Sequence, residues 1–348
     1  MMIAHFSGNV YFISVLKEVM TKKIAIIGAG LAGLTAANIL KKNSEVTVFE
    51  KNSCIGGRLS TKYAGDYVFD QGAQFFTARS KEFNDFINIL QSKGCVKSWN
   101  PIFAEFDGSN LLRTDKWTDT YPHFVGVPNM NAIGKHLSQD LNLHSNTSIS
   151  NISYGSEHTL HTSNSDKYEG FDWVILSAPA EQTLSLLTKN IKGYQEIANK
   201  KMIGCFTLML GFDYPLDIIW EAALIKNANI SWISVVNSKP MRTGKHNLVI
   251  HSTNKWAQQH LENDSEEIKK LMLAEIERVL GLKLPQIKHI DLQRWRHVNI
   301  AKQQGSEFII DPVNKIAVCG DWFIRGRVEA AFTSAIKMAT SLLENHLT

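Results

Sequence analysis

The feature that most constrains the fold is a glycine-rich turn near the start of the chain. Gly28, Gly30 and Gly33 follow an apolar, β-branched run from Lys22 to Ile27 and open a helical pattern. In this context the first glycine permits a tight turn, the second lets the backbone approach a pyrophosphate, and the third allows close helix–strand packing. The segment therefore predicts the first strand, turn and helix of a dinucleotide-binding unit.

The residues after this turn narrow the choice of dinucleotide. A second strand from Glu45 to Phe49 ends at Glu50, whose carboxylate can accept hydrogen bonds from an adenosine ribose and disfavours a 2′-phosphate, which leaves FAD or NAD. The turn Gly56-Gly57-Arg58 then supplies a guanidinium fork that can pair with pyrophosphate oxygens. An ordinary NAD dehydrogenase needs no such element, so the combination favours FAD.

Two further segments have the same character. Asp70-Gln71-Gly72-Ala73-Gln74 ends a strand with small residues, which suit a backbone that lies against a flat ring. Near the C-terminus a strand from Ile316 to Cys319 stops at Gly320-Asp321, and an Ala-rich helix begins after a short loop. A strand, a glycine, an acid and a helix N-terminus together indicate a second site for a polar or anionic ligand.

Composition excludes several classes of protein. Of 348 residues, 44% are hydrophobic and 20% charged, and the net charge is only +4, so the chain is predicted to be an ordinary globular protein that does not bind nucleic acid. Four scattered cysteines without CxxC spacing favour a reducing compartment, and no metal site is expected. His158 and His161 are expected to be surface histidines. Without an apolar run long enough to span a membrane, we expect a cytoplasmic protein.

The order of predicted elements indicates two interleaved domains. Helices are expected at 80–93, 129–141 and 264–280 and a hairpin at 146–161, while 204–251 is rich in strands. We predict an FAD-binding domain from 21–80, 145–180 and 312–348, and a mixed α/β substrate domain with an antiparallel sheet from 81–144 and 181–311. Residues 1–20, which lack a basic segment and a cleavage site, are predicted to be a disordered extension rather than a signal peptide.

Several of these motifs together resemble one family. GAGLAGL, FEK, GGRLSTK, DQGAQFFTAR, VGVPNMNAI, VILSAPA and CGDWFIRGRVEAAFTSA are similar to the bacterial renalase group of the flavin amine oxidase superfamily. The resemblance covers nearly the whole chain from about Lys22. It implies an α/β fold whose FAD-binding domain is glutathione-reductase-like, with FAD bound non-covalently. Cys319 is accordingly expected to be a small core residue rather than a flavin attachment site.

The resemblance also implies which residues bind the cofactor. Asp321 is expected at the ribityl or phosphate region, and the helix that starts near Arg327 at the pyrimidine edge of the flavin. The two ligand sites would then hold the two ends of one molecule. The full predicted set is Gly28, Ala29, Gly30, Leu31, Ala32, Gly33, Glu50, Lys51, Gly57, Arg58, Gly72, Ala73, Gln74, Ile149, Gly320, Asp321, Arg327, Val328, Glu329 and Ala330.

The activity that the resemblance implies is oxidation of 2- or 6-dihydro-NAD(P) to NAD(P)+, with dioxygen reduced to hydrogen peroxide. His251, Trp295 and Gln74 are the candidate catalytic residues at the substrate pocket. Taken alone, His251 and Trp295 are equally consistent with core positions, and Arg242, Arg294 and Arg296 with either substrate phosphates or the surface. The implied partners are a small dinucleotide substrate and dioxygen, and the sequence leaves the oligomeric state open.

Two alternatives stay open from the sequence. The first is a flavin-dependent oxidase of small amines; such enzymes often carry a lysine near the flavin and a facing aromatic pair, and neither can be assigned in this sequence. The second is a non-catalytic FAD-binding protein whose second domain binds a partner.

Overall fold

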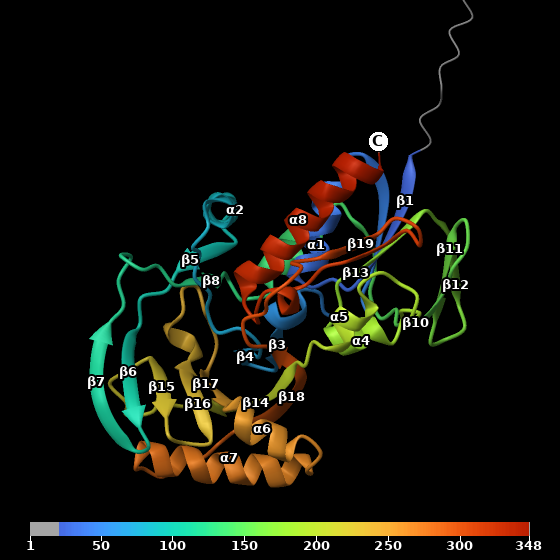
Figure 1. The fold of residues 1–348 in the computed structure, drawn as a ribbon. Coiled ribbons are helices and arrows are strands. Elements are labelled where there is room, and N and C mark those ends of the chain that lie inside the picture. Colours follow the sequence, from blue (N-terminus) through green and yellow to red (C-terminus); the bar gives the residue numbers. More distant parts are fainter. Residues whose placement is uncertain (1–20, 348) are drawn as a thin grey trace, which may run out of the picture.

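The computed structural model describes residues 21–347 and contains two large sheets (Figure 1). The predicted extension at 1–20 lies outside the described residues. The first sheet has six strands, and all its neighbouring pairs are parallel except β19 with β20. In spatial order the strands are β19 (Ile309–Asp311), β20 (Ile316–Val318), β13 (Trp173–Leu176), β1 (Lys22–Ile27), β2 (Ser44–Phe49) and β9 (Asn142–His144).

Both faces of this sheet are covered, as a parallel sheet requires. Ile24 and Ile26 of β1 pack toward α1 (Leu31–Leu40) and α8 (Val328–His346), which lie side by side. The alternate residue Ala25 faces a layer formed by a three-stranded sheet and two short helices. This layer consists of β10 (Ile149–Ser153), β11 (His158–Thr162), β12 (Lys167–Phe171), α4 (Ala180–Leu184) and α5 (Tyr194–Ala198).

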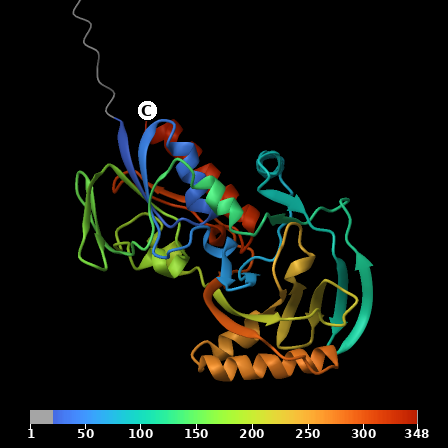
Figure 2. The same cartoon turned by 180° about the vertical axis from the view of Figure 1, so that it is seen from behind.

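The second sheet has seven strands and is antiparallel apart from the pair β15 and β6. Helices α6 (Asn254–His260) and α7 (Ser265–Leu280) cover one of its faces, and the other face turns toward the first sheet (Figure 2). In spatial order the strands are β18 (His289–Asn299), β14 (Ile203–Phe212), β17 (His246–Ser252), β16 (Ile230–Val235), β15 (Ala222–Lys226), β6 (Ile102–Asp107) and β7 (Asn110–Lys116).

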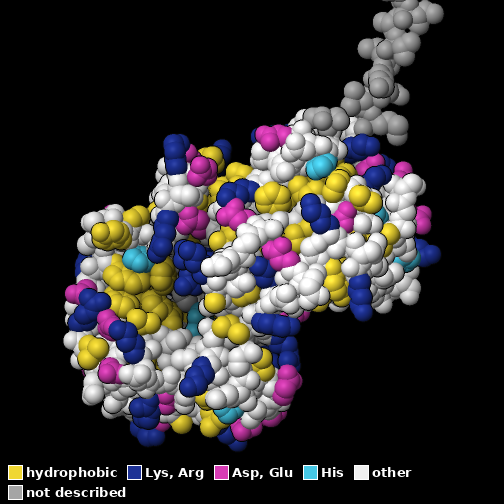
Figure 3. All heavy atoms as spheres, in the orientation of Figure 1, with side chains coloured by type: hydrophobic (Ala, Val, Ile, Leu, Met, Phe, Trp, Pro, Cys, Tyr) yellow, Lys and Arg dark blue, Asp and Glu magenta, His cyan; other side chains and the backbone are white. Residues whose placement is uncertain are grey.

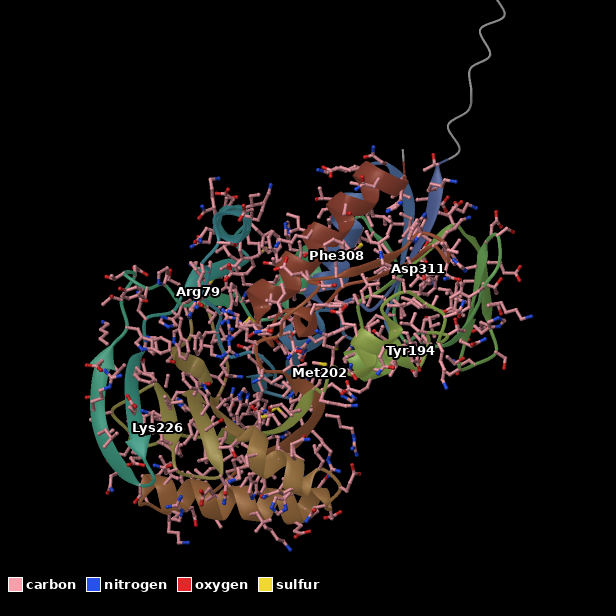
Figure 4. The ribbon with its side chains drawn as sticks, viewed as in Figure 1. Arg79, Tyr194, Met202, Lys226, Phe308 and Asp311 are labelled. Atoms are coloured by element: carbon pink, nitrogen blue, oxygen red, sulfur yellow. The ribbon has the colours of Figure 1, made fainter. Side chains whose placement is uncertain are left out.

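Smaller elements link the two sheets. Met202, just before β14, lies where the chain enters the second sheet, while Phe308 and Asp311 lie on the first-sheet side (Figure 4). Strands β9 and β19, just outside the segments predicted for the FAD domain, also pair in the first sheet. The linking elements are β3 (Thr61–Ala64), β4 (Tyr67–Asp70), α2 (Lys81–Ser92), β5 (Val96–Ser98), β8 (Phe124–Gly126) and α3 (Ala132–Leu137).

Two local predictions are wrong. The helix expected at 129–141 is only α3, because Asp140 has a φ of +59°, which is incompatible with a helix, and the N–H groups of Met130 and Asn131 hold the preceding loop to Asp70 Oδ1 (2.9 Å) and Thr61 Oγ1 (3.2 Å). His158 is not a surface residue but is 1% exposed on the core side of β11. Between residues 21 and 347, no helix combines the length and apolar character needed to cross a membrane.

Candidate functional site

The first glycine turn has the geometry of a dinucleotide cradle. Gly28 has a φ of +109° and its N–H donates to the Phe49 carbonyl at 2.8 Å, which joins the turn to β2. A Cβ on Gly33 would lie 2.0 Å from the Gly28 carbonyl oxygen, so α1 packs against the turn only because residue 33 is glycine. A Cβ on Gly30 would meet no atom within 4 Å. The space beside Gly30 is therefore open to a phosphate, as the motif predicts.

The acid at the end of β2 is held beside this turn. Glu50 is buried, and its two carboxylate oxygens accept from the Ala29 N–H at 3.0 Å and the Asn52 N–H at 2.9 Å. These bonds fix the carboxylate next to the glycine turn, where a ribose hydroxyl can reach its remaining lone pairs. The neighbouring Lys51 side chain contacts Gln182 instead.

The second glycine pair packs directly on the first turn. The Gly56 N–H donates to the Ala29 carbonyl at 2.8 Å, and Gly56 forms an isolated bridge with Gly30. The chain then enters the 3-10 helix η1 (Gly57–Leu59), which carries Arg58. A Cβ on Gly57 would lie 3.3 Å from the Gly30 Cα, so glycine is needed for this contact.

Arg58 and Asp321 bring the two ends of the sequence together. The guanidinium donates to both carboxylate oxygens of Asp321, at 2.7 and 2.5 Å, and to the Val298 carbonyl at 2.9 Å. Burial alone would lower the pKa of Arg58, but Asp321 raises it above the ordinary value. We expected the two side chains to bind separate parts of the cofactor, and in the structure they pair with each other. This ion pair places the two predicted ligand sites next to each other.

The second helix N-terminus also borders this site. Helix α8 begins after Arg327 without a side-chain cap, and α1 begins after Gly30 in the same way. The Glu329 carboxylate accepts from the backbone of Ser80 at 2.7 Å, so it ties α8 to α2. Two helix N-termini without side-chain caps provide partial positive charge and free N–H groups for an anionic ligand. Cys319 is fully buried, burial raises the pKa of its thiol to about 12, and its predicted core position is confirmed.

Two glycine substitutions separate cofactor binding from folding. Gly30→Ala is expected to change the free energy of unfolding by less than about 0.5 kcal/mol, because the added methyl group meets open space and φ is −74°. The same methyl group would occupy the space that the pyrophosphate needs, so we expect FAD to be lost. Gly33→Ala is the matched control, expected to lower the free energy of unfolding by about 1–3 kcal/mol by overpacking. Urea unfolding and the flavin content of the purified variants measure both effects; full flavin in Gly30→Ala would contradict the cradle.

A buried polar cluster lies beyond the loop that ends β4. The Oε1 atom of Gln74 accepts from Lys239 Nζ at 3.0 Å and Ser234 Oγ at 2.7 Å, and its Nε2 atom lies 3.4 Å from His251 Nε2. Asp70 pairs with Lys239 at 3.3 Å and with Arg242 at 2.5 Å. The predicted residues Gln74 and His251 therefore meet, in a cluster that also contains residues the sequence did not single out.

The pKa shifts in this cluster follow from burial and charge. Burial and the charge of Lys239 lower the pKa of His251 to about 4, so the imidazole is neutral at pH 7. Burial lowers the pKa of Lys239 to about 8 although Asp70 opposes the shift. Burial alone would raise the pKa of Asp70, but Lys239 and Arg242 lower it. Two cations thus face one carboxylate, which leaves the cluster with a positive charge near neutral pH.

The open face of the second sheet carries aromatic side chains. His251 lies opposite Trp232 on β16 and Thr207 on β14, and Trp295 lies opposite Cys205. Residues 205 and 207 share a face of β14, so His251, Trp232 and Trp295 do as well. Trp295 Nε1 donates to the Gln71 carbonyl at 3.1 Å, which fixes this ring against the loop after β4.

Beside Trp232 the aromatic side chains form a cluster. Phe75 lies 5.1 Å from Trp117 and 5.3 Å from Trp232, measured between ring centroids, and Trp117 stacks on His123. Figure 3 shows a hollow on this side of the molecule, with a hydrophobic patch and Lys and Arg side chains beside it. The cluster consists of Phe75, Trp99, Phe103, Trp117, His123 and Trp232. Sequence reasoning missed it, because its members come from five separate segments.

The remaining candidates are placed as follows. Arg242 is not at the surface but buried, where it binds Asp70 and the Gly126 carbonyl. Arg294 donates to the carbonyl groups of Leu261 and Asn263, and Arg296 pairs with Glu262. Each of these three guanidinium groups is therefore bound to a protein partner. Ile149 starts β10 and packs in the core beneath β1 and β2.

Comparison with known proteins identifies the family. A model of an NAD(P)-binding Rossmann-like domain matches residues 26–90, and a model of flavin containing amine oxidoreductases matches residues 104–343. The chain belongs to the flavin containing amine oxidoreductases. It is therefore a flavin-dependent oxidoreductase with FAD as its cofactor, and the open cradle at Gly30 and the uncapped helix N-termini fit that dinucleotide.

Individual relatives agree with this assignment. The chain is 23% identical to renalase from Mus musculus, over 91% of this chain and 97% of the mouse protein. A 4,4′-diapophytoene desaturase from Staphylococcus aureus is 40% identical, over 20% of this chain and 16% of its own. A candidate protoporphyrinogen oxidase from Exiguobacterium sp. 255-15 has a TM-score of 0.76 and 14% identity, over 93% of this chain and 99% of its own. Putrescine oxidase with putrescine bound has a TM-score of 0.71 and 13% identity, over 94% of this chain and 100% of its own.

Proposed function

We propose that this protein oxidises 2- or 6-dihydro-NAD(P) to NAD(P)+. The observation that carries the proposal is the composition of the face opposite the cofactor cradle: a neutral His251 and the flat ring of Trp232 beside a polar cluster with positive charge. Aromatic walls suit a planar ring, and positive charge suits a substrate with phosphates while it opposes a protonated amine. The similarity to mouse renalase over 91% of the chain agrees with this choice.

The proposed chemistry asks little proton transfer of the protein. Bound FAD would supply the acceptor for a hydride and return the electrons to dioxygen as hydrogen peroxide. Because the ring nitrogen of a dihydronicotinamide drives loss of the hydride, the protein has only to hold that ring in place and exclude water. His251, Gln74 and Trp295 are proposed to do this, and the uncharged His251 imidazole is suited to a hydrogen bond with the substrate.

A direct test compares reductants under anaerobic conditions. The purified FAD-loaded protein is mixed with 2-dihydro-NAD, 6-dihydro-NAD, ordinary NADH and common amines, and flavin absorbance is recorded. We expect the 2- or 6-dihydro isomer to bleach the flavin within seconds and ordinary NADH to act far more slowly. On admission of air, one hydrogen peroxide should form per NAD+. Bleaching by amines alone would contradict the proposal, and bleaching by no compound would favour the non-catalytic alternative.

Amine oxidation is the second candidate, and Lys239 is the observation that favours it. This lysine, which the sequence did not identify, is fully buried and contacts Gln74, and flavin amine oxidases often carry a lysine near the flavin. Its ammonium group, however, is already bound to Asp70 and Gln74 and lies 5.5 Å from the centroid of the Trp99 ring. The amine arm of the anaerobic experiment decides between the two candidates.

A further inference from the structure

The orientation of the Gln74 side chain is determined by its neighbours. An ammonium group has donors only, so the atom of Gln74 that lies 3.0 Å from Lys239 Nζ has to be the amide oxygen. Ser234 Oγ donates to the same oxygen at 2.7 Å. The amide nitrogen therefore points the other way, where the carbonyl groups of Asp70 and Gly72 accept from it at 2.5 and 3.0 Å. Both ends of the amide agree on one orientation.

This orientation in turn selects a tautomer of His251. The imidazole Nε2 lies 3.4 Å from the Gln74 amide nitrogen, which is not an acceptor and already donates its two hydrogens to the Asp70 and Gly72 carbonyls. A hydrogen on His251 Nε2 would point at this nitrogen and find no acceptor there, so the contact favours the tautomer with the proton on Nδ1. The positive charge of Lys239 opposes a second proton on the ring. His251 is thus a neutral imidazole with one N–H group.

The Nδ1–H group is available to a ligand. Among residues 21–347, no protein atom forms a hydrogen bond with His251 Nδ1. Polar atoms that are both enclosed by protein and without a partner occur elsewhere in the structure, but Nδ1 is not among them. This nitrogen therefore borders open space. Trp232 lies opposite His251 on the neighbouring strand, so both side chains belong to the same face of the sheet. A donor on a face that carries aromatic side chains fits a planar ring with a carbonyl group.

We propose that Lys239 is a positioning residue: through Gln74 it fixes His251 as the Nδ1–H tautomer, and that N–H group donates to a carbonyl oxygen on the substrate ring. Under the proposed function, on which this last step rests, the acceptor is the carboxamide of the dihydronicotinamide. Asp70 keeps the ammonium of Lys239 in place, and Arg242 binds the same carboxylate oxygen at 2.5 Å. The arrangement from Asp70 to Lys239, Gln74 and His251 is called the amide relay below.

The protonation of His251 can be measured directly. In the FAD-loaded full-length protein with 15N-labelled histidine, NMR distinguishes protonated from unprotonated ring nitrogens, and the signals that disappear in His251→Gln belong to His251. We expect wild type to show a protonated Nδ1 and an unprotonated Nε2. In Lys239→Met the amide loses its charged donor but keeps Ser234 and the Asp70 and Gly72 carbonyls, so a fraction of the Nε2–H tautomer should appear beside the Nδ1–H form. The Michaelis constant for the dihydronicotinamide should rise about five- to tenfold, the effect of one hydrogen bond, with kcat changed less than about twofold.

Two further variants keep the proposal falsifiable if Lys239→Met does not fold. Gln74→Glu has the same shape but presents an acceptor, so it should move the His251 proton to Nε2. Ser234→Ala is the matched control: it removes the other donor to Gln74 and leaves Lys239, so the tautomer should stay as in wild type. An Nε2 proton in wild type, or an Nδ1 proton in both Lys239→Met and Gln74→Glu, would overturn the proposal. A purely structural Lys239 would lower the thermal midpoint without changing the tautomer.

The outcome separates this proposal from the proposed function. The tautomer is read without substrate, so a protein with the expected Nδ1 proton that does not oxidise dihydronicotinamides would contradict only the function. Oxidation of a dihydronicotinamide by a protein whose His251 carries the proton on Nε2 would contradict only the amide relay.

Discussion

Asp70→Ala is expected to lower the free energy of unfolding by about 4–5 kcal/mol, which is enough to unfold many chains of this size. Asp70 is fully buried, and its carboxylate pairs with the buried cations Lys239 and Arg242. It also accepts from Thr61 Oγ1 at 3.0 Å. Removal of the carboxylate would leave two positive charges in the interior without a counterion. Urea unfolding at pH 7 measures the loss, and the yield of soluble protein indicates it if the variant cannot be purified.

The control and the pH dependence follow from the same charges. Glu262→Ala removes the exposed partner of Arg296 and should leave the urea midpoint nearly unchanged. Because the folded pKa of Asp70 lies below its ordinary value, its stabilising effect is present above about pH 4 and is lost as the pH falls through the lower folded value. A midpoint for Asp70→Ala as high as that of wild type would show that the cations are hydrated and not enclosed.

Asp321→Ala is expected to cost both stability and cofactor. Asp321 is 4% exposed and Arg58 30% exposed in their ion pair, so loss of the acid should lower the free energy of unfolding by about 3 kcal/mol, the lower end of the range for breaking a buried pair. The unpaired guanidinium of Arg58 would turn away from its position between the Gly28–Gly33 turn and Gly320. We therefore expect FAD retention to be at least about tenfold weaker, which is the effect of one lost charge-assisted contact. Flavin content after gel filtration and urea unfolding of the FAD-free protein measure the two effects.

A double-mutant cycle tests whether the pair acts as a unit. If it does, Arg58→Met combined with Asp321→Ala should be less destabilising than the sum of the two single variants, by about 1–3 kcal/mol. The matched control is Glu307→Ala, which removes the exposed partner of Lys337 on α8. This variant should keep its flavin. Strictly additive effects together with normal flavin content would contradict the role of the pair. The FAD-loaded fraction of Asp321→Ala should keep its choice of substrate.

Local patterns in the sequence predicted much of the cofactor side of the site. The run from Lys22 to Ile27, the three glycines after it and the Phe49–Glu50 strand end belong to one short βαβ segment and meet in the fold, so spacing alone locates them. The same holds for the strand before Gly320 and the helix after Arg327. Asp264, whose side chain caps α7, lies at the start of the helix expected at 264–280. The domain boundaries and the roles of individual cofactor contacts stay predictions.

The substrate side depends on contacts that no local pattern records. Lys239 and Gln74 are separated by 165 positions, and the ammonium that reads as an exposed charge in the sequence is 0% exposed in the fold. The sequence is consistent with Arg242 as a phosphate ligand or as a surface residue, and burial against Asp70 excludes a surface position. Trp232 lies opposite His251 only because β16 pairs with β17, and no local pattern in the sequence indicates this neighbour.

The sequence by itself determined the dinucleotide fold and the cofactor, because the glycines, Glu50 and Arg58 act through backbone geometry and charge within short segments. It indicated the family through the resemblance of its longer motifs. Only the tertiary structure decided which side chains of the site contact one another. It paired Arg58 with Asp321 across 263 positions and so placed two predicted ligand sites next to each other. It also enclosed Lys239 next to Gln74, whose amide nitrogen lies 3.4 Å from His251. Burial changes the energy of a charge far more than sequence neighbours do, and burial is set by how the two sheets face each other.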